Sequence, residues 1–111
     1  MKIATFDLMP YDSRKSFYGK AKILENIETG DVFLQSYDTI VCGIVNGHFE
    51  KYWPGYSATT MRHINSFIYA YSHKADNITC QSSGKKFWEA MECKEAPVYP
   101  VDANYRVVCY Y

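Results

Sequence analysis

At 111 residues, with 48% hydrophobic and 22% charged residues, the chain has the size and composition of one globular domain, which excludes an intrinsically disordered protein. Twelve basic and twelve acidic residues give a formal net charge of zero, which disfavours both a strongly basic nucleic-acid binder and an acidic DNA mimic. The patterns below predict a single α+β domain over residues 1–111. Its expected form is an antiparallel β-meander of four to six strands packed on one main helix, plus a short second helix.

The N-terminal residues MKIATFDLMPYD hold no apolar run long enough for a signal peptide, and no stretch approaches the ~20 apolar residues of a membrane span. We therefore expect a cytoplasmic protein with no membrane partner, whose four cysteines stay reduced and structural. A disulfide between Cys80 and Cys93 is the alternative. Because no cysteine or histidine has the spacing of a zinc site, we expect no metal and no cofactor.

The first predicted hairpin joins residues 20–27 to residues 31–37, because apolar and polar side chains alternate in both runs. Gly30 fits the left-handed position of the three-residue loop between them. A further strand, formed by residues 2–6 or by residues 105–110, is expected to cover an edge of the sheet.

The strongest hairpin signal is Asn46-Gly47, because both residues of such a turn need positive φ angles. It separates the β-branched residues 39–45 from the aromatic-rich residues 48–53. A two-residue loop predicts three cross-strand pairs. These are Ile44 with Phe49 and Ile40 with Trp53 on one face, and Val41 with Tyr52 on the other.

Helical periodicity begins after Pro54-Gly55 and predicts the main helix over about residues 57–72, capped by Ser57 or Thr59. The predicted buried stripe is Met61, Ile64, Ile68 and Tyr71. The flanking residues are Thr60, His63 and Phe67, and the opposite face holds Arg62, Asn65, Ser66 and Tyr69. A short second helix is expected over about residues 85–92, with Phe87, Trp88 and Met91 on its apolar side.

The start of the main helix is the first candidate site. Backbone N–H groups at a helix N-terminus, beside hydroxyls and a cation, can bind phosphate or carboxylate, while aromatic rings stack on a base or another ring. The alternative is an ordinary helix cap with aromatic side chains that close the core. The candidate ligand- or partner-binding residues are Trp53, Tyr56, Ser57, Thr59, Thr60, Arg62 and His63.

The segment RKSFYGKAK, residues 14–22, is the second candidate site, because it combines four cations and two aromatic residues with no acid. Such a segment suits a phosphate-bearing single strand or an acidic protein surface. It is equally typical of a solvated strand entry whose lysines protect a sheet edge. Its candidate residues are Arg14, Lys15, Phe17, Tyr18, Lys20 and Lys22.

Catalytic motifs are absent from the sequence, which has no G-x-S-x-G, H-E-x-x-H, Walker A or G-x-G-x-x-G pattern. The spacing of the histidines, cysteines and carboxylates gives no reason to choose a catalytic pair. We therefore expect a protein that is not an enzyme.

Four segments of the chain carry a resemblance: FDLMP (residues 6–10), RKSFYGKA (14–21), SYDTIV (36–41) and WPGYSATTMRHINSF (53–67). With them the chain resembles a family of short uncharacterised proteins encoded by bacteriophages and mobile elements, notably those of gut Firmicutes. The resemblance covers about residues 1–70, and W-x-G-Y-S-x-T-T-x-x-H-I is its most specific part. Since that family is of unknown function, it implies no catalytic residues. It implies an accessory phage protein in the cytoplasm of a bacterial host.

In that setting we expect stoichiometric binding that inhibits a bacterial antiviral defence system. The protein would be an anti-CRISPR protein or would sequester a nucleotide immune signal, so its partner would be a defence protein or a nucleotide. The alternative is a nucleic-acid-binding accessory protein that uses residues 14–22. Whether the chain forms a homo-oligomer stays open.

Overall fold

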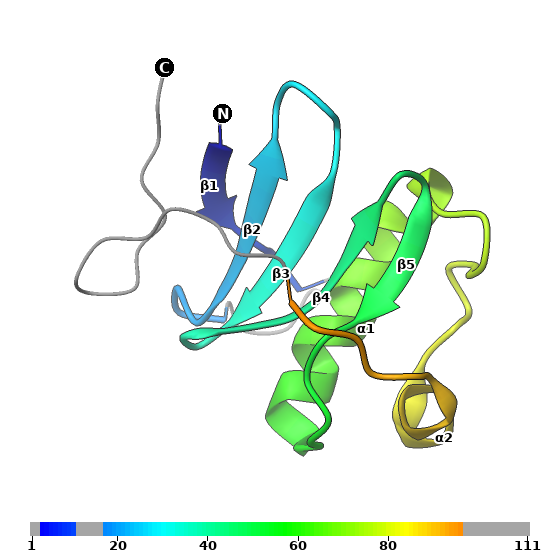
Figure 1. The fold of residues 1–111 in the computed structure, drawn as a ribbon. Coiled ribbons are helices and arrows are strands. Elements are labelled where there is room, and N and C mark those ends of the chain that lie inside the picture. Colours follow the sequence, from blue (N-terminus) through cyan, green and yellow to red (C-terminus); the bar gives the residue numbers. More distant parts are fainter. Residues whose placement is uncertain (1–2, 11–16, 97–111) are drawn as a thin grey trace.

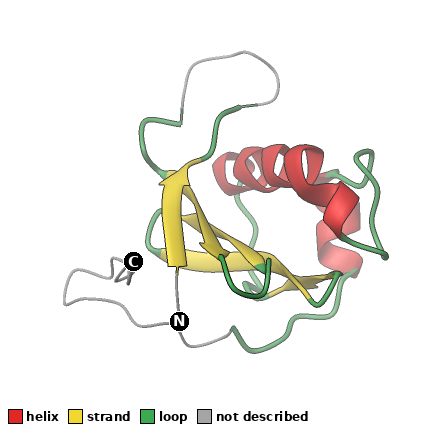
Figure 2. Ribbon diagram, turned by 90° about the horizontal axis from the view of Figure 1, so that it is seen from above, coloured by secondary structure: helices red, strands yellow, loops and turns green. Residues whose placement is uncertain are grey.

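The structure is a computed structural model that describes residues 3–10 and 17–96, and in it one sheet is covered on one face by helices (Figure 1). Each strand is antiparallel to the next, and the sheet order is the chain order. The strands are β1 (Ile3–Asp7), β2 (Ala21–Asn26), β3 (Val32–Ser36), β4 (Thr39–Val45) and β5 (His48–Lys51). The helices are α1 (Ala58–Tyr71), continued by the 3₁₀ turn η1 (Ser72–Lys74), and α2 (Gly84–Ala90). The predicted α+β meander with one main helix and a short second helix is confirmed, and Figure 2 shows its two layers.

Left-handed backbone angles form both predicted hairpin turns. Asn46 and Gly47 have φ angles of 53° and 76°, as a two-residue hairpin loop requires. Ile44 pairs with Phe49 across that turn, as predicted. Gly30 has a φ of 82° in the loop between β2 and β3. The Asn46-Gly47 turn and the left-handed Gly30 are therefore confirmed, but the loop before β3 has four residues and not three, since the Asn26 N–H donates to the Asp31 carbonyl (2.8 Å).

A β-bulge interrupts the pairing of β3 with β4. Leu34 pairs with Cys42, but the next residue, Gln35, pairs with Ile40, so Val41 is an extra residue in β4. An extra residue shifts the alternation of side chains by one and exchanges the two faces of the strand beyond it.

The bulge makes part of the predicted register wrong. Val41 lies in the core beneath α1 together with Ile44, although we expected it on the opposite face. Ile40 instead packs beside Tyr52 in the smaller cluster on the other face of the sheet. The backbone N–H of Tyr52 does donate to the Val41 carbonyl (2.8 Å), so the two residues are neighbours as predicted although their side chains diverge.

α1 begins at the predicted cap, since the Ser57 hydroxyl accepts a hydrogen bond from the backbone N–H of Thr60 (3.1 Å). Its buried surface is wider than predicted. Ser66, expected on the exposed face, has only 2% of its surface exposed. One turn earlier, Phe17, which precedes β2, contacts Arg62 and His63. The buried residues are Thr60, Met61, His63, Ile64, Ser66, Phe67 and Ile68, and Tyr71 is half-buried.

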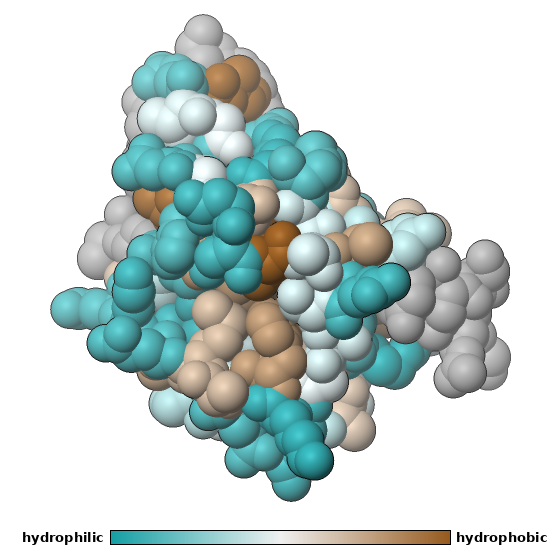
Figure 3. Space-filling model, turned by 90° about the vertical axis from the view of Figure 1, so that its right-hand side faces the viewer, coloured by the Kyte–Doolittle hydropathy of each residue, from teal (hydrophilic) through white to brown (hydrophobic). Residues whose placement is uncertain are grey.

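α2 is held by Trp88, which is fully buried. Its indole N–H donates to the Gly55 carbonyl (2.9 Å), and Lys51 Nζ donates to the Trp88 carbonyl (2.8 Å). Phe87 and Met91 are partly buried against the same core, as predicted. On the side of the molecule that carries α2, Figure 3 shows a strip of apolar surface bordered by hydrophilic atoms.

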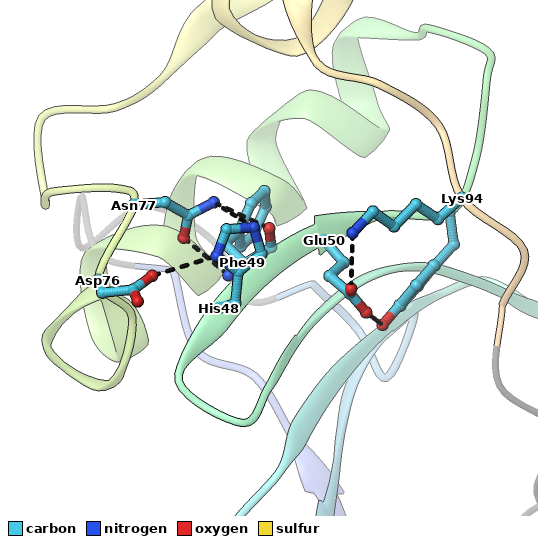
Figure 4. A network of polar contacts seen from close by, with 7 residues as sticks. His48, Phe49, Glu50, Asp76, Asn77 and Lys94 are labelled. Atoms are coloured by element: carbon cyan, nitrogen blue, oxygen red, sulfur yellow. Dashed lines mark hydrogen bonds and ion pairs between the residues drawn. The ribbon is translucent and has the colours of Figure 1, made fainter.

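The outer edge of β5 is occupied by side-chain and backbone groups that follow α1 and α2 (Figure 4). Asn77 Oδ1 accepts from the Phe49 backbone N–H (2.8 Å), and Asn77 Nδ2 donates to the Phe49 carbonyl (3.0 Å). The backbone N–H of Lys94 donates to the Lys51 carbonyl (2.8 Å), and the Lys94 ammonium pairs with Glu50 (3.0 Å). These bonds satisfy an edge that could otherwise pair with another strand.

β1 covers the other side of the meander by pairing with β2, which confirms the strand expected over residues 2–6. The alternative edge strand, residues 105–110, lies outside the described residues. Cys42, Cys80 and Cys93 are free thiols, so the alternative of a Cys80–Cys93 disulfide was wrong. Burial raises the pKa of the Cys42 thiol well above its usual value, which makes this residue an inert part of the core.

Replacing Ile64 with Asp should lower the free energy of unfolding by at least ~3 kcal/mol, because a buried carboxylate would lack a partner. Ala70→Asp is the matched control, since Ala70 is exposed on the same helix and should cost less than ~1 kcal/mol. Urea unfolding measures both variants. Equal effects would show that α1 does not bury this stripe.

Candidate functional site

A pocket of about 220 Å³ lies between the turn before β2, the turn between β3 and β4, and the first two turns of α1. Ligand pockets are commonly ~300–1,000 Å³, so this one suits a small group and not a large cofactor. Its lining residues are Phe17, Tyr18, Lys20, Tyr37, Thr59, Arg62 and His63.

Two cations lie over aromatic rings in the pocket. Lys20 Nζ is 5.6 Å from the centroid of the Tyr37 ring, and Arg62 Cζ is 5.0 Å from the centroid of the Phe17 ring. Cation–π contacts position a charged group without neutralising it. No acidic side chain lines the pocket among the residues that the structure describes. The described lining of the pocket therefore carries positive charge that no lining acid offsets.

A buried polar cluster lies beneath the pocket. Ser36 Oγ is 2.8 Å from His63 Nδ1 and 3.1 Å from Thr60 Oγ1. All three residues are buried, and their hydrogen bonds join the end of β3 to α1. The His63 ring also contacts Phe17 edge-on, with 4.6 Å between the ring centroids, and Tyr37, with 5.8 Å. The cluster thereby fixes two aromatic walls of the pocket.

His63 is neutral at physiological pH. Burial, and secondarily the charge of Arg62, lower the pKa of its imidazole from 6.5 to about 4. A neutral imidazole can donate from one nitrogen and accept at the other, so it can hydrogen-bond to Ser36 and to a ligand at the same time.

Both tyrosines that line the pocket have a backbone conformation that residues other than glycine rarely adopt. Tyr18 and Tyr37 have φ angles of 52° and 57°. The third such non-glycine residue in the described part of the chain is Asn46, which is common in a hairpin turn. For a bulky residue, positive φ is a strained conformation that is found more often at functional sites than elsewhere. Both rings are exposed, at 71% for Tyr18 and 49% for Tyr37.

The pocket combines residues from both predicted sites. Thr59, Arg62 and His63 come from the helix-start site, and Phe17, Tyr18 and Lys20 come from the basic segment. Lys22 does not line this pocket and pairs with Asp7 (2.7 Å) on β1. Arg14 and Lys15 lie outside the described residues.

The other residues of the predicted helix-start site lie elsewhere. Ser57 and Thr60 make the helix cap, as described above. Trp53 packs on the core with its indole against Gly55, where an added Cβ would be 2.6 Å from the ring. Tyr56 carries Lys85 over its ring at 5.2 Å. Trp53 and Tyr56 therefore adjoin α2 and do not line the pocket.

Tyr37 and Ser36 are the residues of this site that sequence reasoning missed. Both belong to the segment SYDTIV, which the sequence analysis used only for its resemblance. A tyrosine in a two-residue turn, where Asn, Asp or Gly is usual, is the local signal that could have identified Tyr37.

Neither a metal site nor a membrane span is found in the described part of the chain. No group of three or more His, Cys, Asp or Glu residues there could hold a metal ion. None of its helices has the length and apolar character needed to cross a membrane.

A family model described as "Family of unknown function (DUF8033)" matches residues 6–89 of the chain. No curated protein and no solved structure matches the chain.

The buried His63 should make the protein less stable in mild acid. The folded-state pKa of about 4 lies below the unfolded value of 6.5, so the unfolded state binds more protons between these values. Stability from this group is complete above pH 6.5 and is lost as the pH falls toward 4, by about 3 kcal/mol in total.

Urea unfolding from pH 7 to pH 4 measures this loss. His63→Gln should flatten the curve across that window, whereas His73→Gln, at an exposed position, should leave the wild-type slope unchanged. Equal slopes for the wild-type protein and His63→Gln would contradict a buried, neutral imidazole.

Proposed function

The chain belongs to the family of unknown function (DUF8033), and because membership assigns no activity, we propose a function from the pocket: the protein binds a small phosphate-bearing ligand that also carries an aromatic ring, such as a nucleotide. One observation carries the proposal. Two cations without a lining acid, and two exposed tyrosines in strained turns, converge on one pocket.

The two kinds of residue match the two parts of a nucleotide. Lys20 and Arg62 supply ammonium and guanidinium donors, which form charge-assisted hydrogen bonds with phosphate oxygens. Tyr18 and Tyr37 supply rings on which a base can stack, a contact worth ~1–3 kcal/mol per base. Turns that hold the backbone of both tyrosines at the pocket before the ligand arrives reduce the entropy lost on binding.

Binding without turnover is the mode that the polar groups favour. Ser36 and His63 are a hydroxyl–imidazole pair of the type used in nucleophilic catalysis. Ser36 is only 3% exposed, however, and does not line the pocket, so its hydroxyl is poorly placed to attack a ligand. We therefore propose a stoichiometric binder with no catalytic residues.

The resemblance to phage and mobile-element proteins suggests where the protein acts and which ligand it binds. In the cytoplasm of a bacterial host, the ligand would be a nucleotide immune signal that the protein sequesters. An anti-CRISPR protein, which would bind a defence protein instead, is the other form of this hypothesis. The exposed rings of Tyr18 and Tyr37 would then anchor the interface.

A nucleic-acid-binding accessory protein is the second candidate, favoured by Phe17, Tyr18 and Lys20 at the pocket. Aromatic rings beside a cation suit an unpaired base and its phosphate. Lys22 pairs with Asp7, so one of the four cations of residues 14–22 is less available to bind phosphate.

Isothermal titration with mononucleotides tests the principal proposal. Saturation near one ligand per chain is expected, and Arg62→Ala and Tyr37→Ala should each weaken binding by ~1–3 kcal/mol through loss of a charged hydrogen bond or a ring contact. Lys85→Ala and Tyr56→Ala are matched controls, because they remove the same kind of cation–tyrosine pair outside the pocket. If the controls weakened binding as much as the pocket variants did, or if no nucleotide bound, this proposal would be rejected. Conversion of excess ligand to product would instead show an enzyme.

The second candidate is tested with single- and double-stranded DNA and RNA at several salt concentrations. With at most four cations in residues 14–22, the slope of log K against log salt should not exceed ~4 in magnitude. A Lys20→Ala variant should reduce that slope by about 1, whereas Lys85→Ala should not. Absence of any binding at low salt would eliminate this candidate.

A further inference from the structure

Three nitrogen-bearing side chains surround the pocket: Lys20, Arg62 and His63. The other polar side chains that line it are Tyr18, Tyr37 and Thr59, which bear hydroxyl groups. No lining carboxylate of the described residues offsets the cations. A bound anion would therefore balance the positive charge of Lys20 and Arg62.

The contacts of His63 leave one of its nitrogens for a ligand. Its Nδ1 atom is engaged by Ser36 Oγ at 2.8 Å, and Phe17 and Tyr37 contact the ring. These contacts prevent the imidazole from turning away from the pocket that it lines. With Nδ1 engaged, Nε2 is the nitrogen through which we expect His63 to meet an anion.

The hydroxyl partners of His63 are compatible with both of its protonation states. When the imidazole is neutral, Nδ1 can accept from the Ser36 hydroxyl. When it is protonated, Nδ1–H donates to Ser36 Oγ, and the Ser36 hydrogen can turn to Thr60 Oγ1, which is 3.1 Å away. Because hydroxyls both donate and accept, the change requires only rotation of hydroxyl hydrogens.

Resting on the proposed function, we infer that the phosphate of the ligand binds between Lys20 and Arg62 against His63, and that His63 takes up a proton from solvent as the anion binds. The protonated imidazole then donates from Nε2 to a phosphate oxygen and from Nδ1 to Ser36. His63 becomes a third cation of the site only when an anion is present.

Electrostatics give the direction of this coupling. Without ligand, burial and the charge of Arg62 hold the pKa of His63 at about 4. A bound anion offsets the charge of Arg62 and attracts the imidazolium, and both effects raise the pKa. Since binding and protonation favour each other, affinity rises as the pH falls, by at most tenfold per pH unit for one proton.

Nuclear magnetic resonance titration of the histidine side chains tests the inference, with sulfate as the probe because it keeps its double charge through this pH range. Samples in high sulfate and in chloride of equal ionic strength are compared from pH 8 to pH 4. The midpoint of His63 should lie higher in sulfate. His48 and His73, both exposed and outside the pocket, are internal controls that should not show this difference.

Binding measurements give a second readout. Sulfate affinity of the wild-type protein should increase severalfold between pH 7 and pH 5, and this increase should be absent in His63→Gln and preserved in His48→Gln. A sulfate response at Lys20 and Arg62 with an unchanged His63 midpoint would overturn proton uptake but leave the anion site intact. No response at any pocket residue would reject the anion site, and the inference with it.

Discussion

The burial of α1 on one face of the meander determines where the other parts of the molecule lie. Ile64, Phe67 and Ile68 are each at most 1% exposed, so the sheet cannot shift beneath the helix without opening an apolar gap. With the helix fixed, Ser36 at the end of β3 lies opposite His63, and their hydrogen bond is buried. A buried polar pair is costly to break, because each group would lose its partner without gaining water. The apolar packing therefore positions the pocket, and the Ser36–His63 bond fixes its spacing.

The pocket is also the place where local preferences and structure disagree. Natural sequences usually agree with their structures at every level, and exceptions concentrate where function requires them. A turn formed by Tyr18 or Tyr37 would be easier to make with Asn, Asp or Gly. Tyr37 is nevertheless held by a backbone hydrogen bond from its N–H to the Lys20 carbonyl (2.7 Å), which joins the two turns directly. The two turns with strained tyrosines are thus linked by a hydrogen bond at the rim of the pocket.

Much of the fold could be predicted because its signals are local. Asn46-Gly47 and Gly30 define hairpins through their backbone angles, and the apolar spacing of α1 defines its inner face. The bulge at Val41 could not be read in the same way, because it depends on how β3 and β4 align and not on either strand alone. The burial of Ser66 was missed as well, because the periodicity of α1 alone does not show how wide a surface the tertiary fold covers.

The sequence predicted the residues of the candidate site as two separate sites, and it assigned the wrong aromatic neighbours to one of them. Lys20 and Arg62 were each chosen for charge beside aromatic residues, but the aromatic partners assigned to Arg62 were Trp53 and Tyr56. In the structure these two lie near α2, and Phe17 takes that place beside Arg62. Sequence distance explains the difference, because the pocket is made by three segments that only the tertiary fold brings together.

The charges of the molecule as a whole favour a small anion over a polyanion. The chain has no net charge, and several lysines are matched by acids on the surface, as Lys74 is by Glu25 (3.6 Å) and Lys22 by Asp7 (2.7 Å). Long-range attraction of a nucleic acid is therefore weak, and binding a strand tightly needs many phosphate contacts. Lys20 and Arg62, by contrast, lie over aromatic rings that leave their charge available. A small ligand that places its phosphate in the 220 Å³ pocket and its ring on an exposed tyrosine at the rim can use both features at once, whereas a polymer gains only one phosphate contact from the same pocket.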